Sequence, residues 1–321
     1  MKKLISAILV TILTLLALAS CNTNDDTKTP DTTENVKINI GVMAGPTGMG
    51  MAKLMSDAGE NSDKYAFEIY SAPTNATADL ASGELDMLCL PTNTAAALAN
   101  KQSDYITVLA INTLGSLYLM SDAENEIKTI SDLEGKTIYA SVPSSTTGPI
   151  INYILKANNV NATVEFEADH DALVAKVKDG SAPIAILPEP KATAALMQNN
   201  TYAIDLNLST EWRKVSSTPL TMGCIVVRNE FLKEHKSAVD SFLAEYKASI
   251  EYINTPANLS TSAQMIVDAG VIPKLPVSTK ALTNLYGSIV YLDGDEMKAA
   301  LENFYTVIEL KKPESSFYYE K

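Results

Sequence analysis

Glycine, hydroxyl and amide residues gather where apolar runs of the sequence give way to helical patterns. The first such place is Met43–Met55, MAGPTGMGMAKLM. A phosphate-binding P-loop needs lysine and a hydroxyl residue after its last glycine, whereas Met51 and Ala52 follow Gly50. The dinucleotide-binding turn also fails, because these glycines give G-x-x-G-x-G, the wrong order. What remains is a strand ending in a glycine-rich turn that opens a helix, where free N–H groups attract anions and polar groups.

The same construction recurs at LPTNTAAALA (90–99) and at ASVPSSTTGPIINYIL (140–155). In open α/β sheets the ligand crevice lies at the carboxyl ends of the strands, so we expect these helix starts to converge on one cleft. The alternatives are structural: a tight turn at 46–49 and ordinary N-caps at the other two places. The candidate ligand-binding residues are Pro46, Thr47, Gly48, Met49, Thr92, Asn93, Ser144, Ser145, Thr146 and Thr147.

The charge of the ligand stays open at this point. These loops contain no arginine, and their one lysine, Lys53, lies inside the first helix, so an anion would depend on backbone amides and hydroxyls. Glu189, between two prolines at a strand end, is a candidate acceptor for an amine or heterocyclic N–H of the ligand; its alternative is a solvated loop carboxylate. Trp212 is a candidate for stacking on a ring, with plain packing as the alternative.

Catalytic patterns are weak. His170 and His235 are the only histidines, and both stand among charged residues. No G-x-S-x-G elbow appears, no His or Cys pair has the spacing of a zinc site, and DLNLSTEW lacks the regular ligands of a calcium loop. We therefore expect a binding protein and not an enzyme, with no cofactor and no metal.

The N-terminus predicts export. Lys2 and Lys3 precede the apolar run 4–18, which ends in LASC at Cys21, the order of a secretory signal peptide over residues 1–20. This end also resembles a bacterial lipobox, which implies a lipid on Cys21 and anchoring to the outer face of the cell membrane; an ordinary signal peptide is the alternative. Residues 22–36 are almost wholly polar, so we expect 21–36 to form a disordered tether.

The charge balance argues against nucleic acid as a partner. Removal of residues 1–20 takes away Lys2 and Lys3, so 23 basic side chains remain against 38 acidic ones, a net charge of −15. Of the three cysteines, Cys89 and Cys224 sit in apolar runs and are expected to be buried free thiols.

The elements that must position these residues alternate along the chain. Apolar runs predict strands at 37–43, 66–72, 85–91, 106–112, 136–142, 163–169, 182–188, 202–208 and 222–228. Helical patterns separate them, and after 228 the chain turns almost wholly helical, over 230–254, 260–269, 278–286 and 294–309. Near-continuous apolar strands alternating with helices indicate α/β architecture, with mostly parallel sheets flanked by helices.

Several of these segments resemble type II periplasmic solute-binding proteins. IKTISDLEGKTIYAS (127–141) is similar to the segment that opens the second lobe of that family, and ASGELDMLCLPTN (81–93) to a first-lobe segment ending at the ligand cleft. ILPEP (186–190) and GPTG (45–48) resemble the subgroup of nitrate-, sulfonate- and thiamine-precursor-binding proteins.

The resemblance implies two lobes around a ligand cleft, residues 37–118 with 222–321 in the first and 119–221 in the second. Asn112 and Thr113, at the first crossing, become candidate cleft residues by position. The implied function is that of a monomeric ABC-importer lipoprotein, which closes on a sulfonate-like anion or a pyrimidine-like heterocycle and delivers it to permease subunits. The alternatives are a ligand-sensing lipoprotein without import, or an enzyme of the same fold.

Overall fold

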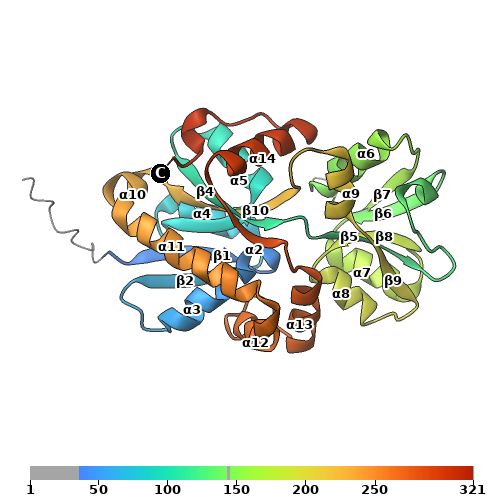
Figure 1. Ribbon diagram of the computed structural model, residues 1–321, viewed down its shortest axis with the longest axis horizontal. Coiled ribbons are helices and arrows are strands. Elements are labelled where there is room, and N and C mark those ends of the chain that lie inside the picture. The colour runs from blue at the N-terminus through green and yellow to red at the C-terminus, as the bar shows by residue number, and fades with distance from the viewer. Residues whose placement is uncertain (1–35, 143–144, 321) are drawn as a thin grey trace, which may run out of the picture. The chain divides into compact units, whose positions relative to one another are not determined.

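The computed structural model describes residues 36–142 and 145–320, and its strands form two separate sheets (Figure 1). The first sheet has the order β11-β4-β10-β3-β1-β2, and the second has the order β7-β6-β8-β5-β9. We call the part of the chain around each sheet the first and the second lobe. Strands of the first sheet are β1 (Ile38–Met43), β2 (Tyr65–Tyr70), β3 (Met87–Pro91), β4 (Ile106–Leu114), β10 (Thr221–Arg228) and β11 (Ile289–Leu292). Strands of the second are β5 (Leu117–Asp122), β6 (Thr137–Ser141), β7 (Thr163–Glu167), β8 (Ile184–Pro188) and β9 (Tyr202–Asn207).

Parallel pairing dominates where strand and helix alternate. β1 pairs in parallel with β2 and β3, and β6 with β7 and β8. β10 runs antiparallel between β3 and β4, and β5 runs antiparallel between β8 and β9. β11, which pairs antiparallel with β4 at the edge of the first sheet, is also reversed. The reversed strands β10 and β5 each directly follow a place where the chain passes between lobes.

Helices cover both sheets. In the first lobe these are α2 (Pro46–Met49), α3 (Ala52–Ala58), α4 (Pro73–Ser82), α5 (Thr92–Lys101), α10 (Asn229–Glu234), α11 (Lys236–Ile253), α12 (Leu259–Asp268), α13 (Leu275–Asn284) and α14 (Gly294–Val307). The second lobe has α6 (Thr147–Ala157), α7 (His170–Asp179), α8 (Lys191–Leu196) and α9 (Leu208–Val215). Short 3-10 turns lie at Ile130–Leu133, Pro256–Asn258 and Ser315–Phe317.

All nine predicted strands are present, with no end shifted by more than two residues. Two strands were not predicted, β5 and β11. β11 has only four residues, and β5 follows β4 after two residues, so no turn-rich segment separates the two strands in the sequence. The single helix predicted over 230–254 is wrong, because α10 and α11 are separate helices divided at His235.

The chain passes between the lobes twice. The first crossing runs through Gly115 and Ser116, between β4 and β5, and the second follows α9 and ends where β10 starts at Thr221. A side chain at position 115 is excluded, because a Cβ there would lie 1.7 Å from Ser209 Oγ of α9. The glycine thus allows α9 to pack directly against the first crossing.

Apolar side chains fill both faces of the first sheet. Cys89 and Cys224 belong to different clusters on the two faces, and both are fully buried free thiols, as predicted. Burial raises the pKa of the Cys89 thiol to about 12. Two buried thiols on opposite faces of one sheet cannot approach each other as a disulfide requires.

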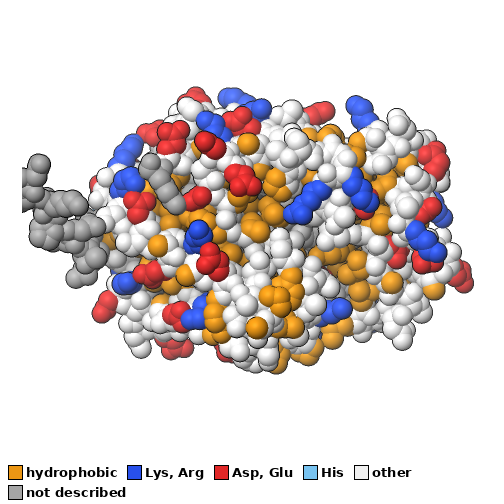
Figure 2. Space-filling model, viewed as in Figure 1, with side chains coloured by type: hydrophobic (Ala, Val, Ile, Leu, Met, Phe, Trp, Pro, Cys, Tyr) orange, Lys and Arg blue, Asp and Glu red, His pale blue; other side chains and the backbone are white. Residues whose placement is uncertain are grey.

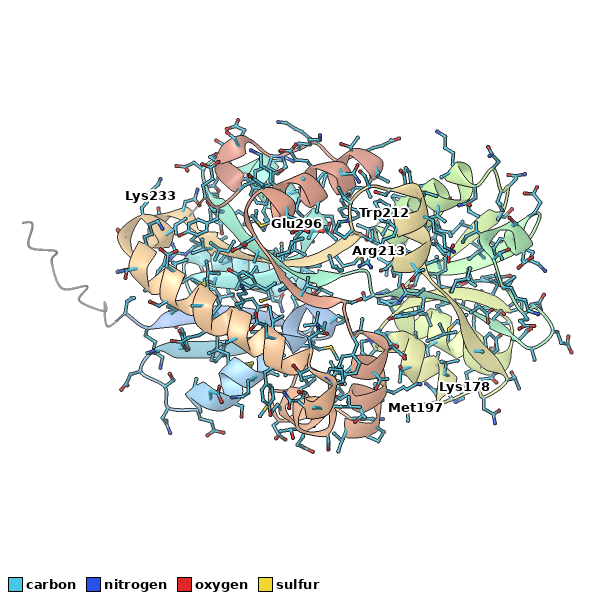
Figure 3. All side chains as sticks on the ribbon, viewed as in Figure 1. Lys178, Met197, Trp212, Arg213, Lys233 and Glu296 are labelled. Carbon is cyan, nitrogen blue, oxygen red and sulfur yellow. The ribbon has the colours of Figure 1, made fainter. Side chains whose placement is uncertain are left out.

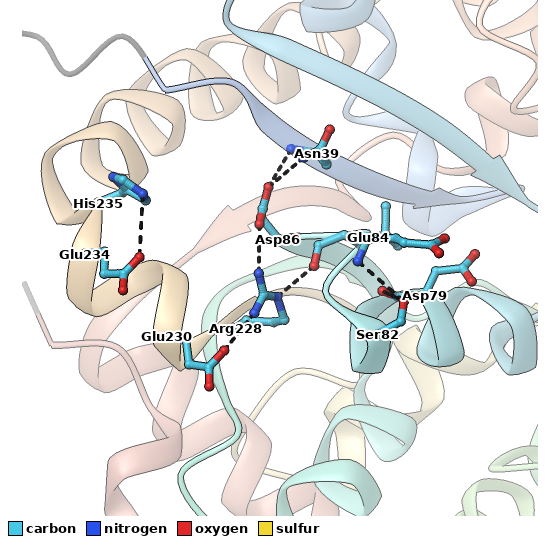
Figure 4. Close-up of polar contacts among 10 residues, drawn as sticks. Asn39, Asp79, Ser82, Glu84, Asp86, Arg228, Glu230, Glu234 and His235 are labelled. Carbon is cyan, nitrogen blue, oxygen red and sulfur yellow. Dashed lines mark hydrogen bonds and ion pairs between the residues drawn. The ribbon is translucent and has the colours of Figure 1, made fainter.

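A buried ion pair joins three strands of the first lobe (Figure 4). Arg228, at the end of β10, donates to Asp86 Oδ1 at 3.1 Å and to Leu85 O at 2.9 Å. Asp86 Oδ2 accepts from the backbone N–H and side-chain amide of Asn39. Since Asn39 is near the start of β1 and Asp86 precedes β3, the cluster lies at the amino ends of these strands, away from their carboxyl ends. Its role is to hold the lobe together.

Surface charge is mixed. Figure 2 shows acidic and basic side chains interspersed over the visible face, with no large basic patch. Among the residues of 36–320 that the structure describes, no helix combines the length and apolar character needed to cross a membrane.

Candidate ligand-binding site

A cavity of about 810 Å³ lies between the two lobes. Its walls come from the carboxyl ends of strands and the helix starts that follow them, in both lobes. The helices whose first residues or preceding loops border it include α2, α4, α5 and α13 of the first lobe and α6, α7 and α8 of the second. Amide groups in the first turn of a helix have no partner within that helix, and the dipole places positive potential there. The cavity is thus surrounded by donors.

Side-chain caps are scarce at these helix starts. The N-cap positions of α4, α5 and α13 are Ala72, Pro91 and Lys274, and none makes a side-chain capping hydrogen bond. At α6, the Thr147 N–H donates to Ser145 Oγ at 3.3 Å. The starts of α7 and α8 do have side-chain acceptors, because Asp169 accepts from the Ala172 N–H and Glu189 from the Thr193 N–H. At α4, α5 and α13 no side-chain cap competes with a bound solute for the first-turn amides.

Only the first part of the glycine-rich turn lines the cavity. Pro46 and Thr47 line it, whereas Gly48 and Met49 do not and are buried against the first lobe. Gly48 is needed for packing, because a Cβ there would lie 2.2 Å from the Met43 carbonyl oxygen. The preceding Gly45 has φ +91°, a conformation that glycine adopts without strain.

Asn112 and Thr113 lie behind this turn and do not line the cavity. Asn112 Nδ2 donates to Thr47 O at 3.1 Å, and Thr113 Oγ1 donates to Pro46 O at 3.3 Å. Both side chains are buried. They therefore fix the backbone of the turn, a contact that position in the sequence did not indicate.

The other two predicted loops do reach the cavity. Thr92 and Asn93 line it from α5, and Ser145, Thr146 and Thr147 line it from α6. Ser144 lies outside the residues that the structure describes. The structure thus brings hydroxyl and amide side chains from both lobes to one cavity.

Glu189 lines the cavity but already has partners. It is 2% exposed, and Thr193 donates to it from its hydroxyl at 2.9 Å and from its N–H at 3.2 Å. Across the lobe boundary, Asn284 Nδ2 of α13 donates to Glu189 Oε1 at 2.6 Å. Burial raises the pKa of Glu189, while the bonds from Asn284 and Thr193 act in the opposite direction. The carboxylate links the lobes and is not a solvated loop group.

His170 was missed as a cavity residue in the sequence. It is the first residue of α7 and lines the cavity, and its Nδ1 lies 2.5 Å from Ser141 Oγ. Burial and the neighbouring Lys191 lower its pKa, with Asp171 and Asp169 opposing. The signal that could have found it is the one used elsewhere, a strand (163–167) followed by a helix start.

The remaining walls are basic at two points and otherwise mostly apolar. Lys191 lines the cavity and pairs with Asp171, and Lys274 lines it from the start of α13. Val271, Ile272, Pro273 and Val277 form an apolar wall, and Leu117 and Met222 also line the cavity. Trp212, on α9 (Figure 3), is fully buried, packs against the Tyr153 ring at an interplanar angle of 42°, and is not part of the lining.

Within 36–142 and 145–320 there is no group of three or more His, Cys, Asp or Glu side chains that could hold a metal ion. The polar groups of the cavity are hydroxyls, amides, two lysines, one histidine and one buried carboxyl. Such a set can bind an anionic or polar solute, and it contains no pair of free carboxylates suited to acid–base chemistry.

Comparison with protein families gives a match over residues 53–269 to the family described as ABC transporter, phosphonate, periplasmic substrate-binding protein. That match covers more than half of the chain. A search of curated proteins gave no match.

Solved structures confirm the two-lobed fold. An ABC transporter protein from Parabacteroides distasonis is 20% identical, with a TM-score of 0.74 over 89% of this chain and 99% of its own. The periplasmic aliphatic sulphonate binding protein SsuA from Escherichia coli is 15% identical, with a TM-score of 0.68 over 88% and 92%. The periplasmic nitrate-binding protein NrtA from Synechocystis PCC 6803 is 12% identical, with a TM-score of 0.62 over 85% and 81%.

Proposed function

Because the chain belongs to the phosphonate family of ABC-transporter periplasmic substrate-binding proteins, we propose that its cavity binds a small organic oxyanion such as a sulfonate or a phosphonate. The observation that carries this proposal is the convergence of helix N-termini from both lobes on one cavity, at α4, α5, α6 and α13. Each such terminus stabilises a nearby negative charge by about 0.3–1 kcal/mol, and more where the site is partly buried.

The rest of the lining supports an anion that carries an organic group. Lys191, Lys274 and His170 add positive or protonatable groups around the cavity. The volume of about 810 Å³ is within the range of organic-ligand pockets and much larger than a bare oxyanion requires. The apolar wall of Val271, Ile272, Pro273 and Val277 offers a surface for the organic group.

The second candidate ligand is a pyrimidine-like heterocycle, whose N–H would donate to Glu189. Three donors already occupy its two carboxyl oxygens, and they come from Thr193 and Asn284. One acceptor position, on Oε2, is left for a heterocycle N–H, and Glu189 is only 2% exposed, so the arrangement favours the oxyanion.

In the cell, we propose that this extracytoplasmic protein is held at the outer face of the membrane by a lipid on Cys21. Two bodies, 37–118 with 222–321 and 119–221, close on the solute by rotation at the two crossings. The closed monomer delivers its solute to the permease subunits. The ligand-sensing alternative uses the same closure without import. A C21S chain should lose membrane attachment, which fractionation of cells would measure.

The first test is calorimetric titration of the full chain with ethanesulfonate, methylphosphonate, uracil and thiamine. We expect saturable binding of at least one of the two oxyanions, weakened strongly when Thr146 is replaced by tryptophan at the start of α6. Binding of uracil or thiamine alone would contradict the oxyanion proposal in favour of a heterocycle. Chemical turnover of any of these compounds would instead support the enzyme alternative.

A further inference from the structure

Thr221 carries a polar group that the folded chain leaves unused. Its side chain is fully buried, and its Oγ1 has no hydrogen-bond partner among the residues that the structure describes. Most buried hydroxyls in proteins have a hydrogen-bond partner, because a hydroxyl that leaves water loses its hydrogen bonds to water, and without a new partner this loss is not offset. A buried hydroxyl without one therefore needs an explanation.

The position of Thr221 supplies that explanation. The residue lines the cavity between the lobes, next to Met222. Its carbonyl oxygen accepts a hydrogen bond from Thr92 Oγ1 at 3.4 Å, so Thr221 lies against the first residue of α5. The N-terminus of α5 is one of the helix starts without a side-chain cap. Thr221 thus lies at the corner of the cavity where α5 begins.

Thr221 also lies at the boundary of the lobes. It is the first residue of β10 and pairs with Leu114, the last residue of β4. Gly115 and Ser116, the first crossing, follow directly. A solute bonded to Thr221 would therefore contact the sheet at the point where both crossings leave it.

We propose that Thr221 is a ligand-binding residue whose hydroxyl donates a hydrogen bond to the oxyanion of the solute beside the N-terminus of α5. This inference rests on the proposed function, and it adds a residue that no pattern in the sequence indicated. The bond is formed only when the solute is bound, so the hydroxyl lowers the stability of the empty protein and strengthens binding. Removing it should have opposite effects on these two quantities.

The test uses the full chain and the variant Thr221→Val, which has nearly the same shape and no hydroxyl. We expect its empty form to unfold at the same temperature as the wild type or higher. We expect its dissociation constant for ethanesulfonate or methylphosphonate to rise by about tenfold or more, since a hydrogen bond to a charged group is being lost. Thr221→Ser, which keeps the hydroxyl, should bind within about threefold of the wild type.

Ser262→Ala is a matched control. Ser262 is also fully buried, and its hydroxyl too has no partner among the described residues, but it lies on α12 and does not line the cavity. Its removal should leave affinity unchanged.

If a probe binds the wild type and Thr221→Val with equal affinity, the role of Thr221 is overturned while the oxyanion proposal stands. A clear loss of stability in the empty variant would have the same consequence. Absence of binding of both probes to the wild type would overturn this inference together with the oxyanion proposal.

Discussion

The bond between Asn284 and Glu189 should hold the lobes together in the absence of solute. Asn284 ends α13 of the first lobe, and Glu189 precedes α8 of the second. The amide donates to the buried carboxyl at 2.6 Å, and Tyr118 of β5 donates to the backbone oxygen of the same asparagine at 2.7 Å. The change that tests this clasp is Asn284→Ala, which removes the amide and leaves the backbone contact in place.

The expected magnitude follows from the geometry. A hydrogen bond to a charged group contributes about 1.5–3 kcal/mol. Losing it should shift the ratio of closed to open protein toward the open form by about 10- to 150-fold. Loss of this donor also removes one of the contacts that oppose the burial-induced rise in the pKa of Glu189, so that pKa should rise further.

The assay is the distance between spin labels on K178C and K233C in a C21S chain. Both native lysines are exposed, one on α7 of the second lobe and one on α10 of the first (Figure 3). The fully buried thiols of Cys89 and Cys224 should not react. Asn284→Ala without solute should show an added population at a different distance, and saturating solute should restore the original one.

The control is Asn258→Ala, which also removes a side-chain amide, one that donates to Tyr252 O within the first lobe at 3.1 Å. Its distance distribution should match that of the wild type. The same distribution in Asn284→Ala, Asn258→Ala and the wild type would refute the clasp.

Two further predictions concern charge. Anion binding should raise the lowered pKa of His170, so affinity for ethanesulfonate should increase as pH falls below about 6.5. Ethanesulfonate itself remains a monoanion over this pH range. Asp169, Asp171 and Lys191 are the charged groups around the His170 ring. His170→Gln should flatten the calorimetric pH profile, and a profile unchanged by that variant would exclude His170. Arg228→Ala should lower the free energy of unfolding by about 3–5 kcal/mol, because the buried Asp86 carboxylate loses its cation and keeps only the two Asn39 donors. In denaturant titration Glu230→Ala, at the exposed partner of the same arginine, should cost less than about 1 kcal/mol; equal losses in the two variants would show that burial of the pair is unimportant.

Much of the fold was predictable because its signals are local. Continuous apolar runs predicted nine strands. The apolar neighbours of Cys89 and Cys224 in the sequence predicted that both are buried and that both are free thiols. The signals for the helix starts at Thr92 and Thr147 were also local, since hydroxyl and amide residues follow closely after predicted strands.

Roles that depend on distant partners were not predictable. Glu189 was expected to face a ligand or solvent, yet its closest partner across the lobes, Asn284, is 95 residues away. Asn112 and Thr113 support the turn at 46–47 through bonds that span 65 and 67 residues. No spacing rule reaches over such separations.

The sequence by itself determined the strand and helix pattern, the free donors at several helix starts and the family resemblance, because these depend on short stretches of chain. Only the tertiary structure decided which of those helix starts share a cavity, that His170 and Thr221 join them, and that Gly48 and Met49 do not. The physical reason is that cavity walls are set by how two sheets and their crossings pack in space, which brings together residues with no relation in the sequence.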